Sequence, residues 1–383
     1  MTKRCLEIRR PSMGVMNDLL GPPAVAGLRG VLARAAGQRD WPALAAAAER
    51  LEPLALRARA DLLAGALLSD LDGGRGHGAG YERADAIFRV ALQDPEFSGW
   101  PIWPVSEAAV TLALQDGRPG SFDDALALLA ELTPRLTGEF AIRRLLIEDL
   151  DRALAIIADW TRHPDGHVRR LASEGTRPYL PWAVRVPEII ARPGATLPLL
   201  DALRRDESEY VRRSVANHLN DVARHAPDEV VAAAGRWSAD PGEHTAWVVR
   251  HGLRTLVKKA HPGALAVLGF TSGGVSVSVP ELDRGTVHLP GELGFGVVVT
   301  NDSGEPARVA IDYVVHYLKA NGLLAPKVFK LAVAELAAGE SRQLRKTHAF
   351  RQMTTRVHYP GRHQLQVQAN GTLSAKAEFD VVS

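Results

Sequence analysis

Cysteine is nearly absent from this 383-residue chain, which contains only Cys5. A single thiol excludes a disulfide framework and any metal site built from several cysteines, and it fits a reducing compartment. Long apolar runs are also missing, because no stretch of 18 or more uncharged apolar residues occurs and the N-terminus has charges but no apolar core of a signal peptide. We therefore expect no membrane association and a cytoplasmic protein.

Zinc-binding and nucleotide-binding motifs are missing as well. The histidines at 163, 167, 218 and 225 do not follow a His-Glu-x-x-His spacing, so we expect them to be solvated or to cap helices. The glycine-rich stretch 71–80 lacks the strand, loop and helix context and the Lys-Ser/Thr pair of a phosphate loop, which indicates a plain loop. The sequence predicts no metal and no cofactor.

Helical periodicity fills the chain up to about residue 269. Apolar residues recur at spacings of three and four, with proline or glycine at the breaks, which predicts helices at 44–51, 84–92, 123–132, 139–159 and 209–224. A period of two then begins and predicts short strands at 275–279, 296–300, 309–315, 328–333, 363–369 and 375–381. We expect an α-solenoid over 1–269 and an immunoglobulin-like β-sandwich over 270–383, without the Cys-Trp-Cys core of antibody domains.

A repeated unit supports the solenoid. The steps Val168-Arg169-Arg170 and Val211-Arg212-Arg213 lie 43 residues apart, and similar steps occur at Ile142-Arg143-Arg144 and Val249-Arg250-His251. A period near 40 is typical of diverged HEAT-like helix pairs, whose stacking gathers equivalent residues on one concave face. We expect arginines to collect there and attract a polyanion.

Charge is distributed unevenly along the chain. The net charge is only +2, but residues 1–160 carry 18 Lys/Arg against 22 Asp/Glu, whereas 319–363 carry nine against two. The segments 342–351 and 354–363 combine these cations with aromatic residues. A charge run is usually a solvated face, but a second basic surface beside the arginine-rich helices favours binding of one polyanion by both domains.

Acidic residues stand among the arginines. Helical spacing places Arg213, Asn217 and Asp221 on one stripe, and it pairs Arg170 with Glu174 and Glu139 with Arg143. Such pairs are usually surface ion pairs worth about 0.3–0.5 kcal/mol. A carboxylate beside a phosphate-binding surface is costly, however, so its presence suggests a positive charge that develops nearby.

Three tryptophans need separate comment. Trp182 ends the segment Arg177-Pro178-Tyr179-Leu180-Pro181-Trp182, whose prolines restrict the chain. It either fills the core between repeats or offers an aromatic face to a cationic base, and the sequence leaves both readings open. Trp100 and Trp103 are expected to anchor the core or a loop.

The runs 167–182, 208–221 and 247–259 resemble the AlkC branch of the bacterial AlkC/AlkD DNA alkylation-repair glycosylases, and segments within 346–363 resemble the extra immunoglobulin-like domain of one AlkC subgroup. The resemblance covers 137–383 well and 1–136 loosely. It implies a solenoid that cradles duplex DNA, a sandwich that closes over it, and excision of N-alkylated bases such as 3-methylcytosine and 1-methyladenine without a cofactor, with the base treated in place.

By motif, the resemblance makes Glu139, Glu174 and Asp221 the active-site acids and Trp182 an aromatic of the cleft. One departure is Tyr179, where the family often has arginine, which puts a phosphate contact at that position in doubt. The DNA-binding residues expected are Arg169, Arg170, Arg177, Arg212, Arg213, Arg250, Arg254, Lys258, Arg345, Lys346, Arg351 and Arg356.

Two other functions stay open on the sequence alone. One is a DNA-binding or damage-sensing scaffold without catalysis, since many HEAT-repeat proteins only bind. The other is a solenoid whose arginines pair with an acidic protein partner. We expect double-stranded DNA with alkylated bases as the partner, a monomer, and association with the bacterial nucleoid.

Overall fold

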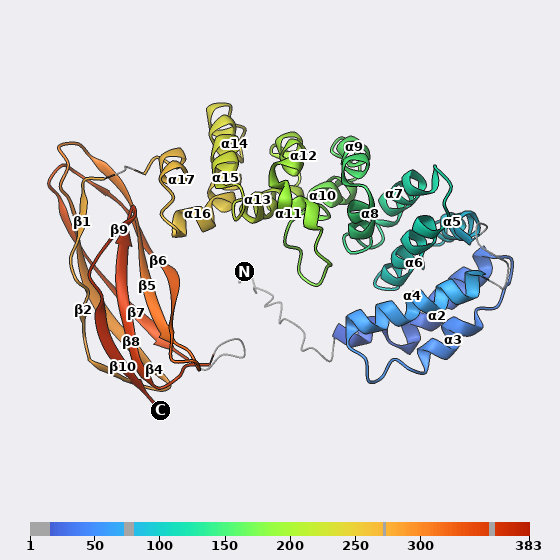
Figure 1. Ribbon diagram of the computed structural model, residues 1–383, viewed down its shortest axis with the longest axis horizontal. Helices are drawn as coiled ribbons and strands as arrows, with labels where there is room; N and C mark the ends of the chain where they lie inside the picture. Colours follow the sequence, from blue (N-terminus) through green and yellow to red (C-terminus); the bar gives the residue numbers. More distant parts are fainter. Residues whose placement is uncertain (1–15, 73–79, 271–272, 352–356) are drawn as a thin grey trace, which may run out of the picture. The chain divides into compact units, whose positions relative to one another are not determined.

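The computed structural model describes residues 16–72, 80–270, 273–351 and 357–383, with helices first and strands last (Figure 1). Three features named above lie outside the described residues: Cys5, most of the glycine-rich stretch and Arg356. A helical region followed by a strand-rich domain confirms the predicted fold class.

The helical elements, in chain order, are η1 (Asp18–Leu20), α2 (Pro22–Ala35), α3 (Pro42–Ala48), α4 (Leu56–Asp72), α5 (Gly80–Ala91), α6 (Ile102–Gln115), α7 (Ser121–Leu132), α8 (Ile142–Glu148), α9 (Leu150–Trp160), α10 (Gly166–Glu174), α11 (Pro187–Ala191), η2 (Pro193–Thr196), α12 (Leu197–Leu203), α13 (Glu209–Val222), α14 (Pro227–Ala239), α15 (Thr245–Gly252), α16 (Arg254–Lys258) and α17 (Pro262–Val267). The strands are β1 (Val275–Val277), β2 (Glu281–Leu282), β3 (Thr286–His288), β4 (Gly291–Asn301), β5 (Ala307–Leu318), β6 (Leu324–Leu336), β7 (Ser341–Phe350), β8 (Gly361–Ala369), β9 (Thr372–Leu373) and β10 (Ala377–Val382).

The chain divides into two compact units. The first comprises residues 1–226 with 242–248, and the second comprises 227–241 with 249–383. Helices α14, α16 and α17 therefore pack with the strands, although the change from helix to strand falls near the predicted residue 270. The boundary at 269/270 stays a prediction.

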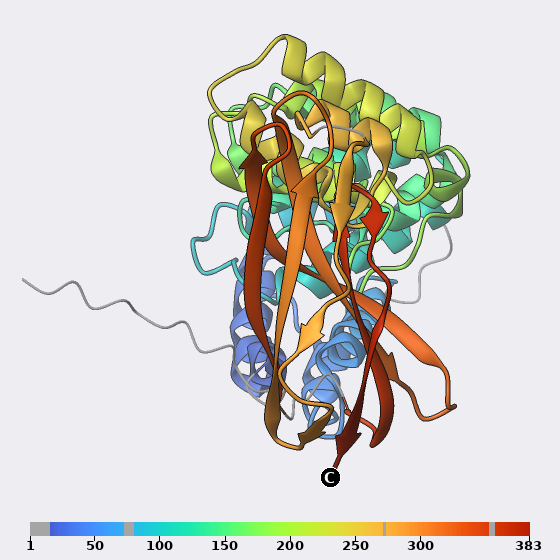
Figure 2. The ribbon, with the colours of Figure 1, turned by 90° about the vertical axis from the view of Figure 1, so that its left-hand side faces the viewer.

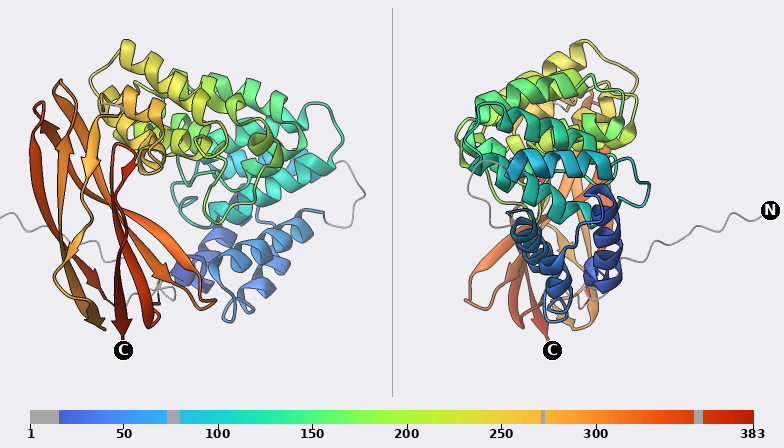
Figure 3. Two further views of the ribbon diagram at one scale, coloured as in Figure 1. Left: turned by 60° about the vertical axis from the view of Figure 1, so that its left-hand side comes forward. Right: turned by 90° about the vertical axis from the view of Figure 1, so that its right-hand side faces the viewer.

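Helices of the first unit lie beside one another in successive pairs (Figure 3). Asp165 is the N-cap of helix α10, and its side chain accepts a hydrogen bond from the His167 amide at 2.6 Å. Its buried Val168 and Leu171, together with Val211 and Val215 of α13, form the apolar contact between the two repeats. This packing brings the two Val-Arg-Arg steps side by side.

The helix predicted at 139–159 is interrupted. Asp149 has φ −150° and ψ 94°, so α8 ends there and α9 begins. The Asp149 carboxylate accepts from the Arg152 amide at 3.0 Å and caps the new helix. Capping by aspartate outweighs the continuous apolar periodicity, which is why the sequence pattern concealed this break.

The predicted aromatic anchor Trp103 is buried in the core of the first helices. It stacks on Phe140 with ring centroids 4.4 Å apart and donates its indole N–H to Glu107 at 3.2 Å. Trp100 lies beside it, 6.1 Å between centroids, and packs against the same core. Through its contact with Phe140, Trp103 stabilises the segment that carries Glu139.

The strands form two sheets (Figure 2). One has the order β1-β4-β2, with β7 on the other edge of β4, and the second has the order β3-β10-β8-β5-β6, with β9 beside β8. Only the β10–β3 pair is parallel among the described strands. Alternate residues of β4, from Leu293 to Val299, face a shared core.

Strand β7 was missed by the sequence prediction, which treated 342–351 as a cationic run. It pairs with β4 along ten positions, from Gly291↔Phe350 to Thr300↔Ser341. Only His348 and Phe350 are buried on β7, and most of the remaining positions carry polar side chains. An apolar period of two is therefore too weak to see in its sequence.

Helix α17 is fixed to the sandwich at its end. Leu265 and Phe270 pack against Ala310 of β5, and Arg308 donates to the Leu268 carbonyl at 2.7 Å while its guanidinium group lies 4.9 Å from the Phe270 ring centroid. These contacts explain why the last helices belong to the second compact unit.

Candidate active site

Five ionisable side chains form one alternating chain of charge in the first unit. In order they are Glu139, Arg170, Glu174, Arg177 and Asp221, joined by N–O distances of 2.6, 3.5, 2.6 and 2.9 Å. The three acids singled out from the sequence are thereby brought together, although 82 positions separate the first from the last. We call this set the charge chain.

Packing of α10 against α13 creates the charge chain. Glu174 is the last residue of α10, and Asp221 lies near the end of α13. Between the helices the Ser214 hydroxyl donates to Glu174 Oε2 at 2.6 Å, and its oxygen lies 3.0 Å from the Ser173 hydroxyl. Glu139 precedes α8 and accepts from the Thr137 hydroxyl at 3.2 Å. Both oxygens of Glu174 are therefore occupied inside the protein.

The charge chain is mostly shielded from water. Side-chain exposure runs from 4% for Asp221 to 15% for Arg170. Burial disfavours the charged guanidinium groups, but the neighbouring carboxylates outweigh that penalty and raise the pKa of both Arg170 and Arg177. Three carboxylates and two guanidinium groups therefore share one site that is largely shielded from water.

His218 is buried next to the charge chain and contacts Ser173, the residue before Glu174. Its ring is fully buried, with Nδ1 2.8 Å from the Ser173 carbonyl oxygen and Nε2 3.0 Å from the Thr196 hydroxyl. Burial and the positive charge of Arg177 lower the pKa of His218 to about 3, so the ring is neutral and Nδ1 donates to the carbonyl. The expectation that this histidine is solvated or caps a helix was wrong.

Arg143 is a further residue that sequence reasoning missed. It does not pair with Glu139 as predicted; it is fully buried and donates to the carbonyls of Gly175, Arg177 and Val184 at 3.0, 2.5 and 2.9 Å. Burial and the nearby Arg177 lower its pKa to about 10. Arg143 thereby holds both ends of the segment that follows the α10 helix. Its place in the repeated hydrophobic-Arg-Arg step was the one available signal.

That segment, between α10 and α11, projects from the helices as a loop (Figure 1) and carries Trp182. Trp182 is 64% exposed and has a φ of +66°, a left-handed conformation that is uncommon for a bulky residue. The core-filling reading of Trp182 is therefore wrong. An aromatic side chain held out to solvent in a strained backbone fits a surface that receives a ligand.

The first arginines of the two repeats make contacts within the protein. Arg169 makes two hydrogen bonds to the Asp206 carboxylate, at 2.6 and 3.1 Å, and Arg212 donates to the carbonyls of Asp206 and Glu207, both at 2.7 Å. Both clamp the turn before α13. DNA binding by Arg169 and Arg212 stays a prediction, whereas Arg213 is exposed and pairs with Glu209.

The predicted cations of the second unit are mostly at its surface. Arg250, Lys258 and Arg351 are exposed, and Arg254 donates to the His251 carbonyl at 2.6 Å. Arg345 and Lys346 line a hollow of about 530 Å³ over β4 and β7, where Gly294 and Gly296 contribute no side chain. The acids Glu281 and Asp283 line the same hollow, so it is of mixed charge.

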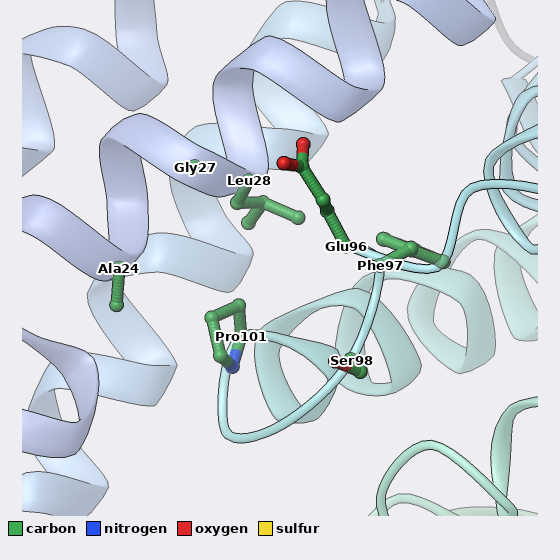
Figure 4. A pocket seen from close by; sticks show the side chains of 7 residues that line it. All are labelled: Ala24, Gly27, Leu28, Glu96, Phe97, Ser98 and Pro101. Atoms are coloured by element: carbon green, nitrogen blue, oxygen red, sulfur yellow. The ribbon is translucent and has the colours of Figure 1, made fainter.

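A second hollow, of about 220 Å³, lies beside α2 and the segment before α6 (Figure 4). Small or apolar residues such as Ala24, Leu28 and Pro101 form most of its wall. Its one ionisable residue, Glu96, pairs with Arg34 at 2.8 Å. This hollow therefore offers no reactive group, and the charge chain is the stronger candidate site.

Within the described residues, no group of three or more His, Cys, Asp or Glu side chains is arranged to hold a metal ion. No described helix has the length and apolar character needed to cross a membrane. The chemistry of the candidate site must accordingly be argued from carboxylates, guanidinium groups and one exposed aromatic ring.

Comparison with known proteins gives the family. The chain is 35% identical to the uncharacterized protein YhaZ of Bacillus subtilis over 262 residues, which is 68% of this chain and 72% of that protein. It is also similar to a solved structure, the alkylpurine DNA glycosylase AlkC of Pseudomonas fluorescens bound to DNA containing an abasic site analog. The two share 30% identity and a TM-score of 0.77 over 96% of this chain and 99% of that one. The chain belongs to the AlkC/YhaZ family.

The C-terminal region places the chain among the AlkC/YhaZ proteins that carry a sandwich domain. Residues 276–383 match the family model described as the C-terminal Ig-like domain of the uncharacterised protein YhaZ. This match agrees with the two observed sheets and confirms the immunoglobulin-like prediction. The recognised resemblance to AlkC is confirmed as well.

Proposed function

We propose that this protein is a DNA glycosylase that hydrolyses the N-glycosidic bond of cationic N-alkylated bases, such as 3-methylcytosine and 1-methyladenine, in duplex DNA. The charge chain carries this proposal, because it holds three nearly buried carboxylates in one place within a chain similar to AlkC over almost its full length. A purely structural ion-pair network would need no excess of acid over base.

The chemistry of the substrate matches these groups. An alkylated base of this kind carries a positive charge that disappears when its bond to C1′ breaks, so departure needs no strong general acid. The deoxyribose then becomes positive and resembles an oxocarbenium ion, and a water molecule must attack it. Carboxylates perform both tasks in glycoside hydrolysis, by electrostatic stabilisation and by orienting water.

We assign Asp221 and Glu174 to the sugar and the water, and Glu139 to a supporting role near the base. Arg170 and Arg177 hold these acids in place through ion pairs, which makes both arginines positioning residues in this proposal. An ionised carboxylate that is already oriented requires no reorganisation as positive charge develops on the sugar.

Trp182 complements the acids. Its exposed indole lies on the loop whose ends are held by Arg143, and an aromatic face attracts a cationic base by about 1 kcal/mol or more when water is excluded. We propose that it contacts the damaged base pair and thereby favours the charged lesion over a neutral base.

DNA binding is proposed for the exposed cations. Arg213 lies on α13, Arg250 lies on α15, and Arg254 and Lys258 lie on α16. Arg345, Lys346 and Arg351 belong to the sandwich, and Arg356 lies outside the described residues. Contacts of this kind position a duplex through its phosphates and make affinity depend strongly on salt.

Duplex oligonucleotides that each carry one defined methylated base test the activity. After incubation, alkaline cleavage converts every abasic product into a strand break. We expect breaks at 3-methylcytosine and 1-methyladenine but not at unmodified sites. If 3-methylcytosine duplexes stay intact over hours, the proposed activity fails, and unchanged DNA binding would then favour a non-catalytic scaffold.

Substitutions test the assigned acids. Asp221→Asn and Glu174→Gln preserve shape but remove the negative charge, so we expect excision to fall at least 100-fold, the scale of losing one electrostatic stabiliser, while DNA binding persists. Glu209→Gln is the matched control, because Glu209 lies on the same helix α13 but is exposed and pairs with Arg213. Full activity of both site variants would contradict the assignment.

A further inference from the structure

Tyr179 carries two arginine side chains on its ring. The guanidinium carbon of Arg224 lies 4.6 Å from the ring centroid, and that of Arg185 lies 5.3 Å from it. The His225 ring is nearly parallel to Tyr179, with an interplanar angle of 16°, centroids 5.6 Å apart, and its Nε2 2.5 Å from the Tyr179 hydroxyl. We call these four residues the Tyr179 cluster.

The cluster has unbalanced positive charge. Arg185, Arg224 and His225 are exposed, and in the described part of the chain neither arginine forms an ion pair. Cation–π attraction to one ring holds both guanidinium groups, although like charges repel. By contrast, Arg170 and Arg177 close by are each bound to two carboxylates. Two neighbouring cations without an acid leave room for an anion.

The position of the cluster indicates which anion. Two side-chain contacts join the segment 177–179 to α13 and the turn after it: Arg177 to Asp221 at 2.9 Å and Tyr179 to His225 at 2.5 Å. The Arg224 amide also donates to the Asp221 carbonyl at 3.2 Å. The cluster therefore adjoins the Asp221 end of the charge chain, within a few residues of a proposed catalytic acid.

We propose that Arg185 and Arg224, held on Tyr179 with His225 beside them, bind one phosphodiester of the DNA backbone next to the deoxyribose assigned to Asp221. This site rests on the proposed function, because a nucleic acid must first occupy the charge chain. Guanidinium groups match the oxygens of a phosphate, and a phosphate fixed beside the reacting sugar sets the register of the duplex. Tyr179 contributes no charge itself; its ring preorganises the two arginines.

The salt dependence of DNA affinity tests the site. Binding of an undamaged fluorescent duplex is measured at several salt concentrations for the wild type, Arg185→Ala, Arg224→Ala and the double variant. Neutralising one phosphate accounts for a slope of about 0.9 in a plot of log affinity against log salt. We expect the slope of the double variant to be smaller in magnitude than the wild-type slope by about 0.9. The control Arg162→Ala removes an arginine that lies just after α9 and is 85% exposed, and it should keep the wild-type slope.

An unchanged slope in the double variant would overturn the proposal. A slope reduced by about 1.8 would indicate two bound phosphates and would overturn the proposal of a single phosphate. Tyr179→Leu removes the ring and should weaken binding as the arginine variants do, whereas Tyr179→Phe should not. Excision is scored separately on methylated duplexes. If the wild type excises the base but the double variant keeps the wild-type slope, only the phosphate site is rejected. If the double variant has a reduced slope but the wild type excises no base, only the glycosylase activity is rejected.

Discussion

Acid should destabilise the helical unit through one histidine. His218 is fully buried, and burial with the charge of Arg177 lowers its pKa from 6.5 to about 3. Between these two pH values the unfolded chain binds a proton that the folded chain excludes. Stability is therefore complete above pH 6.5 and is lost as the pH falls toward 3.

The size of the effect follows from the two pKa values. Between pH 7 and pH 5 the linkage amounts to about 2 kcal/mol, and below pH 6 it approaches about 1.4 kcal/mol per pH unit. The variant His218→Gln has no imidazole to protonate, while its amide retains a donor for the Ser173 carbonyl that His218 contacts at 2.8 Å. We expect its stability to change about 2 kcal/mol less than that of the wild type over this range.

Urea unfolding at pH 7 and pH 5, followed by tryptophan fluorescence, measures this difference. Six of the seven tryptophans lie in the first compact unit and Trp237 lies in the second, so the signal reports mainly the unit that contains His218. His167→Gln is the matched control, because His167 is exposed on α10 and its loss leaves the buried ring in place. If His218→Gln loses as much stability as the wild type between the two pH values, the linkage to His218 is refuted.

Three further substitutions probe the fold and the loop of the candidate site. Trp182→Gly relieves the left-handed φ of +66° and should raise the free energy of unfolding by about 1 kcal/mol while it lowers excision; a loss of stability in urea unfolding would contradict this. Arg143→Met leaves three carbonyls without donors and should cost about 3 kcal/mol or more in the same measurement, and an unchanged midpoint would show that those hydrogen bonds are dispensable. Burial is the main cause that raises the pKa of Asp312, on β5, to about 6. The folded chain therefore loses stability as the pH rises from 4 to above 6. Scanning calorimetry should show that Asp312→Asn raises the free energy of unfolding by up to about 3 kcal/mol at pH 8 and changes it little at pH 4.

Sequence periodicity predicted the fold class because each period reports directly on local structure. Helical spacing before residue 270 and alternation after it correspond to the observed α2–α17 and β1–β10. Failures occurred where polar residues decided the outcome: the capping side chain of Asp149 divided one predicted helix, and the polar face of β7 hid a strand. Neither feature changes the average apolar pattern of its segment.

The candidate site was predictable in its acids and in the Arg170–Glu174 pair, but not in its other contacts. Glu139, Glu174 and Asp221 were recognised by motif, and the structure places them in one charge chain. Their arginine partners were assigned to phosphates instead, and the pair expected for Glu139 was Arg143. Arginine side chains are long and flexible, so helical spacing limits which face they start from but not which partner they reach.

Local rules thus determined where helices and strands occur and which residues carry charge. Only the tertiary structure decided that Arg143 and His218 are buried, that Arg169 and Arg212 clamp a turn, and that Trp182 is exposed. The physical reason is that burial, ion pairing and pKa depend on neighbours that are distant in sequence, and those neighbours meet only when α10 packs against α13.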